Sequence, residues 1–302
     1  MSFQLLNWIL LCGLVLLWGS SFLFTTIAVA TISPLAIVTF RVVLGAVVLV
    51  AALWLKKLKL PTGGAAWGTF FLMGLIGSLL PFFLIAWGQQ AISSGMAGVI
   101  MAIMPLATML LAHYFIAGET LNRFKIMGFF LGIGGVTLLL GPVFVGNSAE
   151  IIGAFAVVVA ACLYALNSVL ARRLPSFTPL VTGAGVLIAS STLSVPIWLF
   201  YSDILGAAFG PEAATVAVTT SVSLDSLIAL IWLGIGPTGI ATLIYFNVIQ
   251  RAGPTFFSTI NYLIPAVAFF AGALFLDEPV TLQNMLALSI VLLGIGLTRY
   301  RA

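Results

Sequence analysis

Ten stretches of mostly apolar residues, each long enough to cross a lipid bilayer, take up nearly all of this chain. A membrane-spanning helix needs about 20 such residues. The stretches are 5–29, 34–54, 66–87, 95–116, 123–140, 150–171, 179–201, 226–248, 255–276 and 281–299. Only 6% of the 302 residues are charged, and little sequence remains for a soluble domain. We therefore predict a polytopic membrane protein.

The predicted spans are helices and not strands of a β-barrel. A barrel strand alternates apolar and polar residues over about ten positions, whereas the run VVLGAVVLVAALWL is apolar on every face. A helix also satisfies its own backbone hydrogen bonds, as the bilayer core requires. The predicted fold class is therefore all-α. The first stretch is expected to be a retained helix, because it lacks the basic start and the cleavage site of a signal peptide.

The charges between the spans predict their orientation. Lys and Arg concentrate on the cytoplasmic side of membrane proteins. If the N-terminus is cytoplasmic and successive spans alternate in direction, every Lys and Arg between the spans or at their ends falls on the cytoplasmic side. That side holds Lys56, Lys57, Lys59, Arg123, Lys125, Arg172, Arg173, Arg251, Arg299 and Arg301, with Glu119 as its one acid. The other side holds Glu150, Asp203, Glu212, Asp225, Asp277 and Glu278. We therefore predict that both termini are cytoplasmic.

The second half of the chain repeats the first. The segment that begins QQAISSGMAG at residue 89 resembles the segment that begins IQRAGPTFF at residue 249, so that Gln90 matches Gln250 and Pro105 matches Pro265. We expect an N-terminal repeat over 1–145 and a C-terminal repeat over 146–302, with five helices in each. Because five is odd, the second repeat must be inverted in the membrane. Secondary transporters use this plan, with the substrate site between the repeats and alternating access to it.

A further match between the halves lies near the middle of the membrane. WGSSF in the first span corresponds to YALNS in the sixth, which pairs Trp18 with Tyr164 and Ser21 with Asn167. An aromatic and a polar side chain at the same depth in both repeats favour a shared cavity.

The order of several short motifs resembles the EamA branch of the drug/metabolite transporter superfamily. WGSSF in the first span, SPLAIVTFR at the start of the second, and MP and IP ahead of GET and DEP carry this likeness, which covers essentially the whole chain. Within the branch, the chain is most similar to the YddG-type amino acid exporters of the bacterial inner membrane. The resemblance implies a central cavity lined by spans 1, 3, 4, 6, 8 and 9, and export of small metabolites such as amino acids. Ser21 departs from the pattern, because many members carry Asn there.

Polar, aromatic and methionine side chains near this depth are the candidate substrate-binding residues. Polar groups in a membrane span tend to face the bundle interior, and aromatic rings can stack against a substrate. The candidates are Trp18, Ser20, Ser21, Trp87, Met101, Tyr164, Asn167, Tyr245, Asn261 and Tyr262. For the serines, the alternative is a hydrogen bond to a carbonyl of their own helix. For an aromatic residue near a helix end, the alternative is that its ring anchors the helix at the membrane–water interface.

Four other residues have two interpretations each. Pro105 and Pro265 are candidate hinges, because proline bends a helix, and static kinks are the alternative. His113 is a candidate proton relay or a structural histidine. Arg41 is the only fixed charge clearly within a span, and we expect a structural role in which it extends to the lipid headgroups. Without a carboxylate near mid-membrane, the cavity would then be uncharged and suit zwitterionic or neutral substrates.

The predicted function is export of small metabolites, chiefly neutral or aromatic amino acids, across a bacterial inner membrane. Export of another metabolite or drug class is the alternative. From a different class, an intramembrane serine hydrolase would need Ser20 or Ser21 to meet His113. The sequence has no Walker A, GxSxG or HExxH motif. We therefore expect no enzymatic activity, cofactor, metal, nucleic-acid partner or obligatory protein partner.

Two sequence features are expected to serve packing. GFFLG, residues 128–132, places two glycines one helical turn apart, and we expect it to join helices within the chain rather than between copies. Cys12 and Cys162 lie inside predicted spans, where a buried thiol behaves as a small apolar group, and no disulfide is expected.

Overall fold

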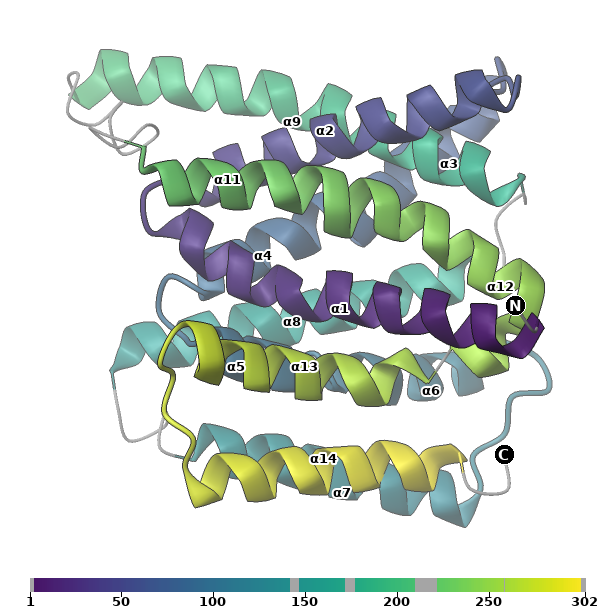
Figure 1. The fold of residues 1–302 in the computed structure, drawn as a ribbon, viewed down its shortest axis with the longest axis vertical. Helices are drawn as coiled ribbons and strands as arrows, with labels where there is room; N and C mark the ends of the chain where they lie inside the picture. Colours follow the sequence, from purple (N-terminus) through teal and green to yellow (C-terminus); the bar gives the residue numbers. More distant parts are fainter. Residues whose placement is uncertain (1–2, 142–146, 172–176, 210–221, 258, 300–302) are drawn as a thin grey trace.

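The computed structural model describes residues 3–141, 147–171, 177–209, 222–257 and 259–299. Within these ranges the secondary structure is helical, and Figure 1 shows the helices running side by side. Their bounds are α1 (Phe3–Val29), α2 (Pro34–Leu55), α3 (Gly64–Gly74), η1 (Leu75–Leu79), α4 (Leu80–Gly88), α5 (Ser94–Ile100), α6 (Ile103–Phe115), α7 (Arg123–Leu140), α8 (Ser148–Ala171), α9 (Pro179–Phe209), α11 (Leu224–Leu233), η3 (Gly234–Ile240), α12 (Ala241–Phe257), α13 (Ile260–Phe275) and α14 (Leu282–Arg299).

These helices form the predicted ten-span architecture. In the described part of the chain, eight helices are long and apolar enough to cross a membrane, and the shorter apolar helices α13 and α14 provide two more. The third span is α3, η1 and α4 together, the fourth is α5 and α6, and the eighth is α11, η3 and α12. The prediction of an all-α membrane protein is therefore confirmed.

The two halves of the chain are inverted relative to each other. Helix α1 begins, and α14 ends, at one face, which we name the terminal face (Figure 1). The opposite face, named the far face, is where α8, the first helix of the second half, begins (Figure 1). The turns that contain Lys56, Lys57 and Lys59 lie at the terminal face, whereas Asp277 and Glu278 lie at the far face. Arg172, Arg173, Glu212 and Arg301 lie outside the described residues.

Two π-helical turns, η1 and η3, occupy corresponding places in the two halves. Each contains a wider turn than the α-helices on either side. The offset of 160 residues that relates Pro105 to Pro265 also relates Gly77 of η1 to Pro237 of η3. Neither turn could be predicted from the hydrophobic pattern.

Helices α7 and α14 pack through glycines. A Cβ atom on Gly128 would lie 2.5 Å from the carbonyl oxygen of Gly294, and a Cβ on Gly294 would lie 2.5 Å from the backbone nitrogen of Gly132. Helix association in lipid depends on such close backbone contact, because lipid tails are as apolar as the side chains. GFFLG therefore joins helices within the chain, as predicted.

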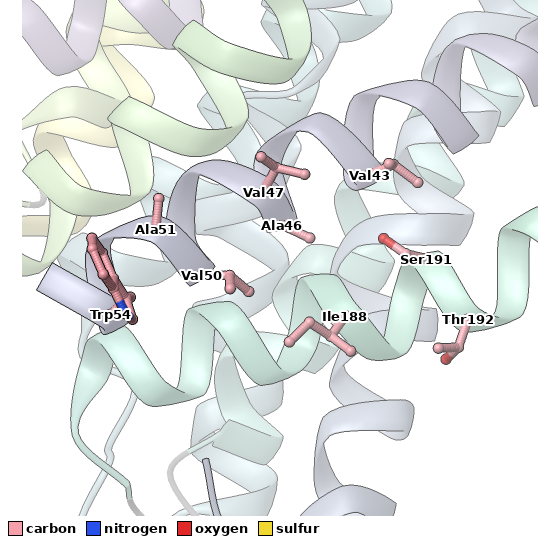
Figure 2. A pocket seen from close by; sticks show the side chains of 9 residues that line it. All are labelled: Val43, Ala46, Val47, Val50, Ala51, Trp54, Ile188, Ser191 and Thr192. Atoms are coloured by element: carbon pink, nitrogen blue, oxygen red, sulfur yellow. The ribbon is translucent and has the colours of Figure 1, made fainter. Parts of the chain in front are cut away.

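On the outer surface, α2 and α9 enclose a shallow apolar groove of about 580 Å³, which is shown in Figure 2. Val43, Val47 and Val50 line one side, and Ile188, Ser191 and Thr192 line the other (Figure 2). None of the predicted site residues contributes to it. An apolar groove on the outside of a membrane protein suits lipid chains.

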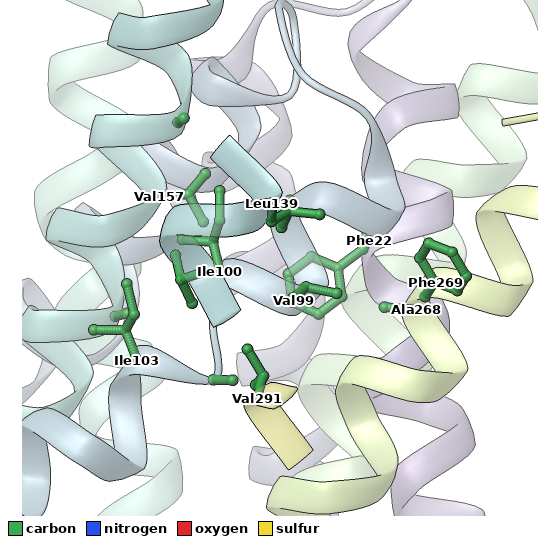
Figure 3. Close-up of a cluster of buried hydrophobic side chains, with 14 of the residues drawn as sticks. Phe22, Val99, Ile100, Ile103, Leu139, Val157, Ala268, Phe269 and Val291 are labelled. Carbon is green, nitrogen blue, oxygen red and sulfur yellow. The ribbon is translucent and has the colours of Figure 1, made fainter. Parts of the chain in front are cut away.

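The largest buried cluster joins both halves of the chain (Figure 3). Phe22 of α1, Ile100 of α5 and Val157 of α8 meet Phe269 of α13 and Val291 of α14 in this cluster. Gly98 lets α5 approach α13, because a Cβ there would collide with Ala268. The cluster therefore fixes the helices that surround the interior cavity described below.

Two local expectations were wrong in detail. Cys12 and Cys162 are unpaired, as expected, but both are exposed on the outside of their helices and not buried. The helix that includes the eighth span continues to Phe257, past the predicted end at 248, although its backbone is kinked at Gly253. The φ angle of Gly253, 80°, lies in the left-handed region that favours glycine, so the chain turns there toward α13.

Candidate functional site

An interior cavity of about 300 Å³ lies where the two halves meet. Described residues from eight of the ten spans line it, and none of those in α7 or α14 does. Its lining residues are Trp18, Ser21, Phe22, Thr25, Arg41, Gly77, Ser78, Phe82, Ile85, Met101, Ala102, Met104, Pro105, Tyr164, Leu187, Pro237, Thr238, Thr242, Asn261, Ile264 and Pro265. All six spans that the family resemblance implied are present, together with one residue each from the second and seventh spans.

Seven of the predicted substrate-binding and hinge residues line this cavity. They are Trp18, Ser21, Met101, Pro105, Tyr164, Asn261 and Pro265. Both members of three matched pairs lie in the wall: Trp18 with Tyr164, the two mid-span prolines, and Met101 with Asn261, which are related by the same offset of 160 residues as the prolines. The repeat thus brings together residues that are more than 140 positions apart.

Trp18 is anchored to the π-helical turn of the second half. Its Nε1 donates a hydrogen bond to the carbonyl oxygen of Pro237, with a distance of 3.0 Å. Its ring packs against Tyr245 and Phe257, with centroid distances of 6.0 and 6.2 Å. Tyr245 therefore supports Trp18 from behind and does not itself line the cavity.

The two serines of WGSSF differ in position. The Ser21 hydroxyl donates to the Trp18 carbonyl oxygen at 2.8 Å and lies at the cavity wall. Ser20 donates to the Leu17 carbonyl oxygen at 3.3 Å and is not part of the wall. Both hydroxyl protons are thus used within α1, and Ser21 can offer only oxygen lone pairs to a ligand in this arrangement.

Four other candidates also lie outside the cavity wall. Asn167 packs against Gly77, and its buried Oδ1 atom has no hydrogen-bond partner in the described part of the chain. Tyr262 donates to the Ile295 carbonyl oxygen at 3.1 Å and so ties α13 to α14. Trp87 is 40% exposed near the far face. His113 is exposed in the last turn of α6, with Nδ1 2.8 Å from the Glu119 carbonyl oxygen.

These positions bear on the hydrolase alternative. Ser21 is inside the cavity, and Ser20 and Ser21 hydrogen-bond within α1. His113 is at the terminal face, where its ring contacts Tyr114 and the loop that contains Glu119. A serine nucleophile needs a base within hydrogen-bond reach, and the structure does not bring these residues together.

The expectation for Arg41 was wrong: it faces the cavity and does not extend to the headgroups. Only 7% of its surface is exposed. Its Nε donates to Thr238 Oγ1 at 2.8 Å, and its Cζ lies 3.9 Å from the centroid of the Phe82 ring. The cause is a close helix approach one turn further along α2, where a Cβ on Gly45 would lie 2.6 Å from Thr238 Cγ2. The cavity therefore carries a positive charge.

Sequence reasoning also missed the partners of Arg41. Thr238 lies in η3 and donates its own proton to the Leu233 carbonyl oxygen at 2.8 Å, so its lone pair is available to Arg41. Phe82 lies one turn beyond η1. The one available signal was Arg41 itself, since an ionisable residue inside a membrane span is a functional candidate by default.

Polar contacts close the cavity toward the far face. Gln89 follows the last residue of α4. Its side-chain nitrogen donates hydrogen bonds to the Phe22 carbonyl oxygen at 2.9 Å and to Thr26 Oγ1 at 2.8 Å. The Ser226 hydroxyl donates to the Ile27 carbonyl oxygen at 2.7 Å. These bonds fasten α4 and α11 to the same end of α1.

A carboxylate fastens a second pair of spans at this face. Glu278, just after α13, accepts hydrogen bonds from the backbone nitrogens of Ser94 (2.6 Å) and Gly95 (2.9 Å) at the start of α5. Gly272 makes room for this contact, because a Cβ there would collide with the carboxylate. Toward the terminal face, by contrast, the lining residues Met104 and Asn261 are partly exposed. The structure is therefore closed at the far face.

Known proteins resemble this chain over nearly its full length. A model of the EamA-like transporter family matches it twice, at residues 6–141 and 151–300. An uncharacterized transporter of Archaeoglobus fulgidus is 25% identical over 294 residues, with 96% of this chain and 97% of the relative covered. The uncharacterized inner membrane transporter YedA of Escherichia coli is also 25% identical, covering 95% and 88%.

Two further matches agree. Protein PagO of Salmonella typhimurium is 25% identical, with 94% of this chain and 89% of the relative covered. One crystal structure matches with a TM-score of 0.66 and 20% sequence identity, over 96% of this chain and 95% of its own. The structural match concerns the fold alone.

Proposed function

Because the chain belongs to the EamA-like transporter family, we propose that it exports small metabolites through the interior cavity by alternating access. The observation that supports this most is the make-up of the cavity wall, which matched positions of the two inverted halves form together. In secondary transporters with inverted repeats, the substrate site lies near mid-membrane between the repeats. Rocking of one half against the other would then expose the site to each face in turn.

The proposed orientation places the terminal face in the cytoplasm. The distribution of Lys and Arg supports it. In that orientation, the closed far face points outward and the partly exposed side of the cavity points to the cytoplasm. An exporter would load its substrate in this state.

For the substrate, we propose amino acids, with neutral and aromatic ones as the first candidates. Trp18, Phe82 and Tyr164 offer aromatic surface, and Met101 and Met104 offer flexible apolar surface that adapts to different side chains. This lining suits a range of side chains better than one. Export of another metabolite class would use the same cavity.

The test is counterflow in proteoliposomes. Vesicles are preloaded with one unlabelled amino acid at a time, and uptake of a labelled neutral amino acid is followed without an ion gradient. We expect transient accumulation of label. Its absence for every amino acid and every other metabolite tried, with folded protein, would contradict the proposed function.

Trp18→Ala is expected to lower the initial counterflow rate at least about tenfold, which corresponds to roughly 1.4 kcal/mol. The substitution removes an aromatic wall of the cavity and the hydrogen bond to Pro237. Trp54→Ala is the matched control, because Trp54 is 79% exposed on the outer surface. Equal rates for the two variants would show that Trp18 does not contribute to the site.

His113→Ala tests the proposed proton relay. Since the His113 ring is exposed and bonded near the terminal face, we expect this variant to keep the native counterflow rate. Uptake driven by an imposed proton gradient is the second measurement. Loss of gradient-driven uptake with normal counterflow would assign His113 to coupling, whereas unchanged uptake would leave it a structural role.

A further inference from the structure

We propose that Arg41 binds a carboxylate group of the transported molecule, so that the substrate is an organic carboxylate with an apolar or aromatic body. This inference rests on the proposed function and narrows its substrate class. It also means that the protein recognises the carboxylate of its substrate and not the ammonium group of an amino acid.

The first support is that Arg41 has unused hydrogen-bonding capacity. Of the guanidinium nitrogens, Nε is bonded to Thr238. The terminal nitrogens Nη1 and Nη2 have no hydrogen-bond partner among the residues that the structure describes. Neither nitrogen is completely buried by the protein. Because Arg41 lines the cavity, these donors are available to a ligand inside it.

The second support is the charge balance. Among the residues that the structure describes, none that lines the cavity is an Asp or Glu. A buried charge without a partner is strongly unfavourable in a membrane protein. An anionic group on the substrate would neutralise Arg41, whereas a cationic group would find no opposite charge in the cavity wall.

The third support is the fixed geometry of the guanidinium. Thr238 holds one edge through the 2.8 Å hydrogen bond, and Phe82 covers the planar face with its ring 3.9 Å away. The remaining edge carries the two terminal nitrogens. A planar fork of this kind matches the two oxygens of a carboxylate, which can accept two parallel hydrogen bonds.

The fourth support is that the charge is found in one half only. If SPL at residues 33–35 is matched to TPL at 178–180, the counterpart of Arg41 is Val186, next to the cavity residue Leu187. The rest of the wall includes Met101, Met104 and Ile264. The cavity thus has one cationic site and an apolar remainder, which suits a molecule with one anionic end.

The experiment uses three compounds with the same aromatic body. Phenylalanine has both charged groups, 3-phenylpropionate lacks the ammonium, and phenethylamine lacks the carboxylate. Native protein in detergent is titrated with each, and the melting temperature is recorded, because a ligand that binds only the folded state raises it. We expect stabilisation by the two carboxylates and none by the amine.

Variants of Arg41 complete the test. In Arg41→Gln, the concentration of either carboxylate needed for stabilisation is expected to rise about tenfold or more, as for loss of charged hydrogen bonds. Arg41→Lys should lie between Gln and native protein, because an ammonium is a point charge without the fork. Arg123→Gln, at the terminal face, is the control and should respond like native protein.

The outcomes separate this inference from the proposed function. Equal stabilisation by the amine, no stabilisation by any of the three compounds, or an unchanged response of Arg41→Gln overturns the carboxylate site. In each of these cases, counterflow of other metabolites would still uphold export through the cavity. Absence of counterflow for all metabolites, with the carboxylates still bound at Arg41, would instead overturn export.

Discussion

Glu278→Gln is expected to open the far face and to raise the labelling of a Thr25→Cys variant by an impermeant maleimide at that face by about tenfold to a hundredfold. The native carboxylate accepts hydrogen bonds from two backbone nitrogens of α5, and the amide of Gln can accept only at its single oxygen. A hydrogen bond to a charged group contributes about 1.5–3 kcal/mol, and each 1.4 kcal/mol is roughly a tenfold change in population.

The reporter and its control follow from the structure. Thr25 lines the cavity and is 2% exposed, so a thiol there is protected while the far face is closed. The exposed Cys12 and Cys162 are first replaced with serine. Asp277→Asn is the matched control, because Asp277 is the exposed neighbouring acid. If labelling stays at the native rate in Glu278→Gln, the bonds of Gln89 and Ser226, and not the carboxylate, keep this face closed.

Gly294→Val is expected to lower the melting temperature in detergent by about 5 °C or more. A Cβ at this position would lie 2.5 Å from the Gly132 nitrogen and 2.8 Å from the Gly128 oxygen, which are backbone atoms that cannot rotate away. Helices α7 and α14 would have to separate. Overpacking of this kind costs about 1–3 kcal/mol.

Gly134→Val is the matched control for this substitution. A Cβ on Gly134 meets no atom within 4 Å, although the residue lies on the same helix as Gly128 and Gly132. We expect its melting temperature to stay close to that of native protein. An equal loss in both variants would mean that the branched side chain, and not the contact between α7 and α14, causes the change.

The sequence was sufficient for the architecture because its signals are local. Spans follow from the length of apolar runs, and the inversion follows from an odd number of helices in each repeat. Trp18 and Tyr164 could be placed in one cavity because the repeat assigns them equal depth. Tyr245, at a similar depth, was not separable from them, since only the packing shows that Trp18 lies between Tyr245 and the cavity.

What the sequence could not supply was the direction in which a side chain points. Arg41 could extend to the headgroups or turn inward, and the choice depends on how closely Gly45 approaches Thr238. Asn167 was placed in the wall by analogy with Ser21, but Gly77 lies at the wall and Asn167 packs against it. Glu278 was informative only for orientation, because its contact with α5 joins residues 184 positions apart.

The π-helical turns η1 and η3 make the cavity depend on the length of the backbone as well as on its side chains. Each turn holds one residue more than an α-helical path would, and one residue rotates everything that follows by about 100° around the helix axis. Without the additional residue in η1, Phe82 would no longer lie against Arg41. Insertion or deletion of a single residue in such a turn is therefore expected to exchange a whole row of lining side chains at once, whereas a point substitution changes one.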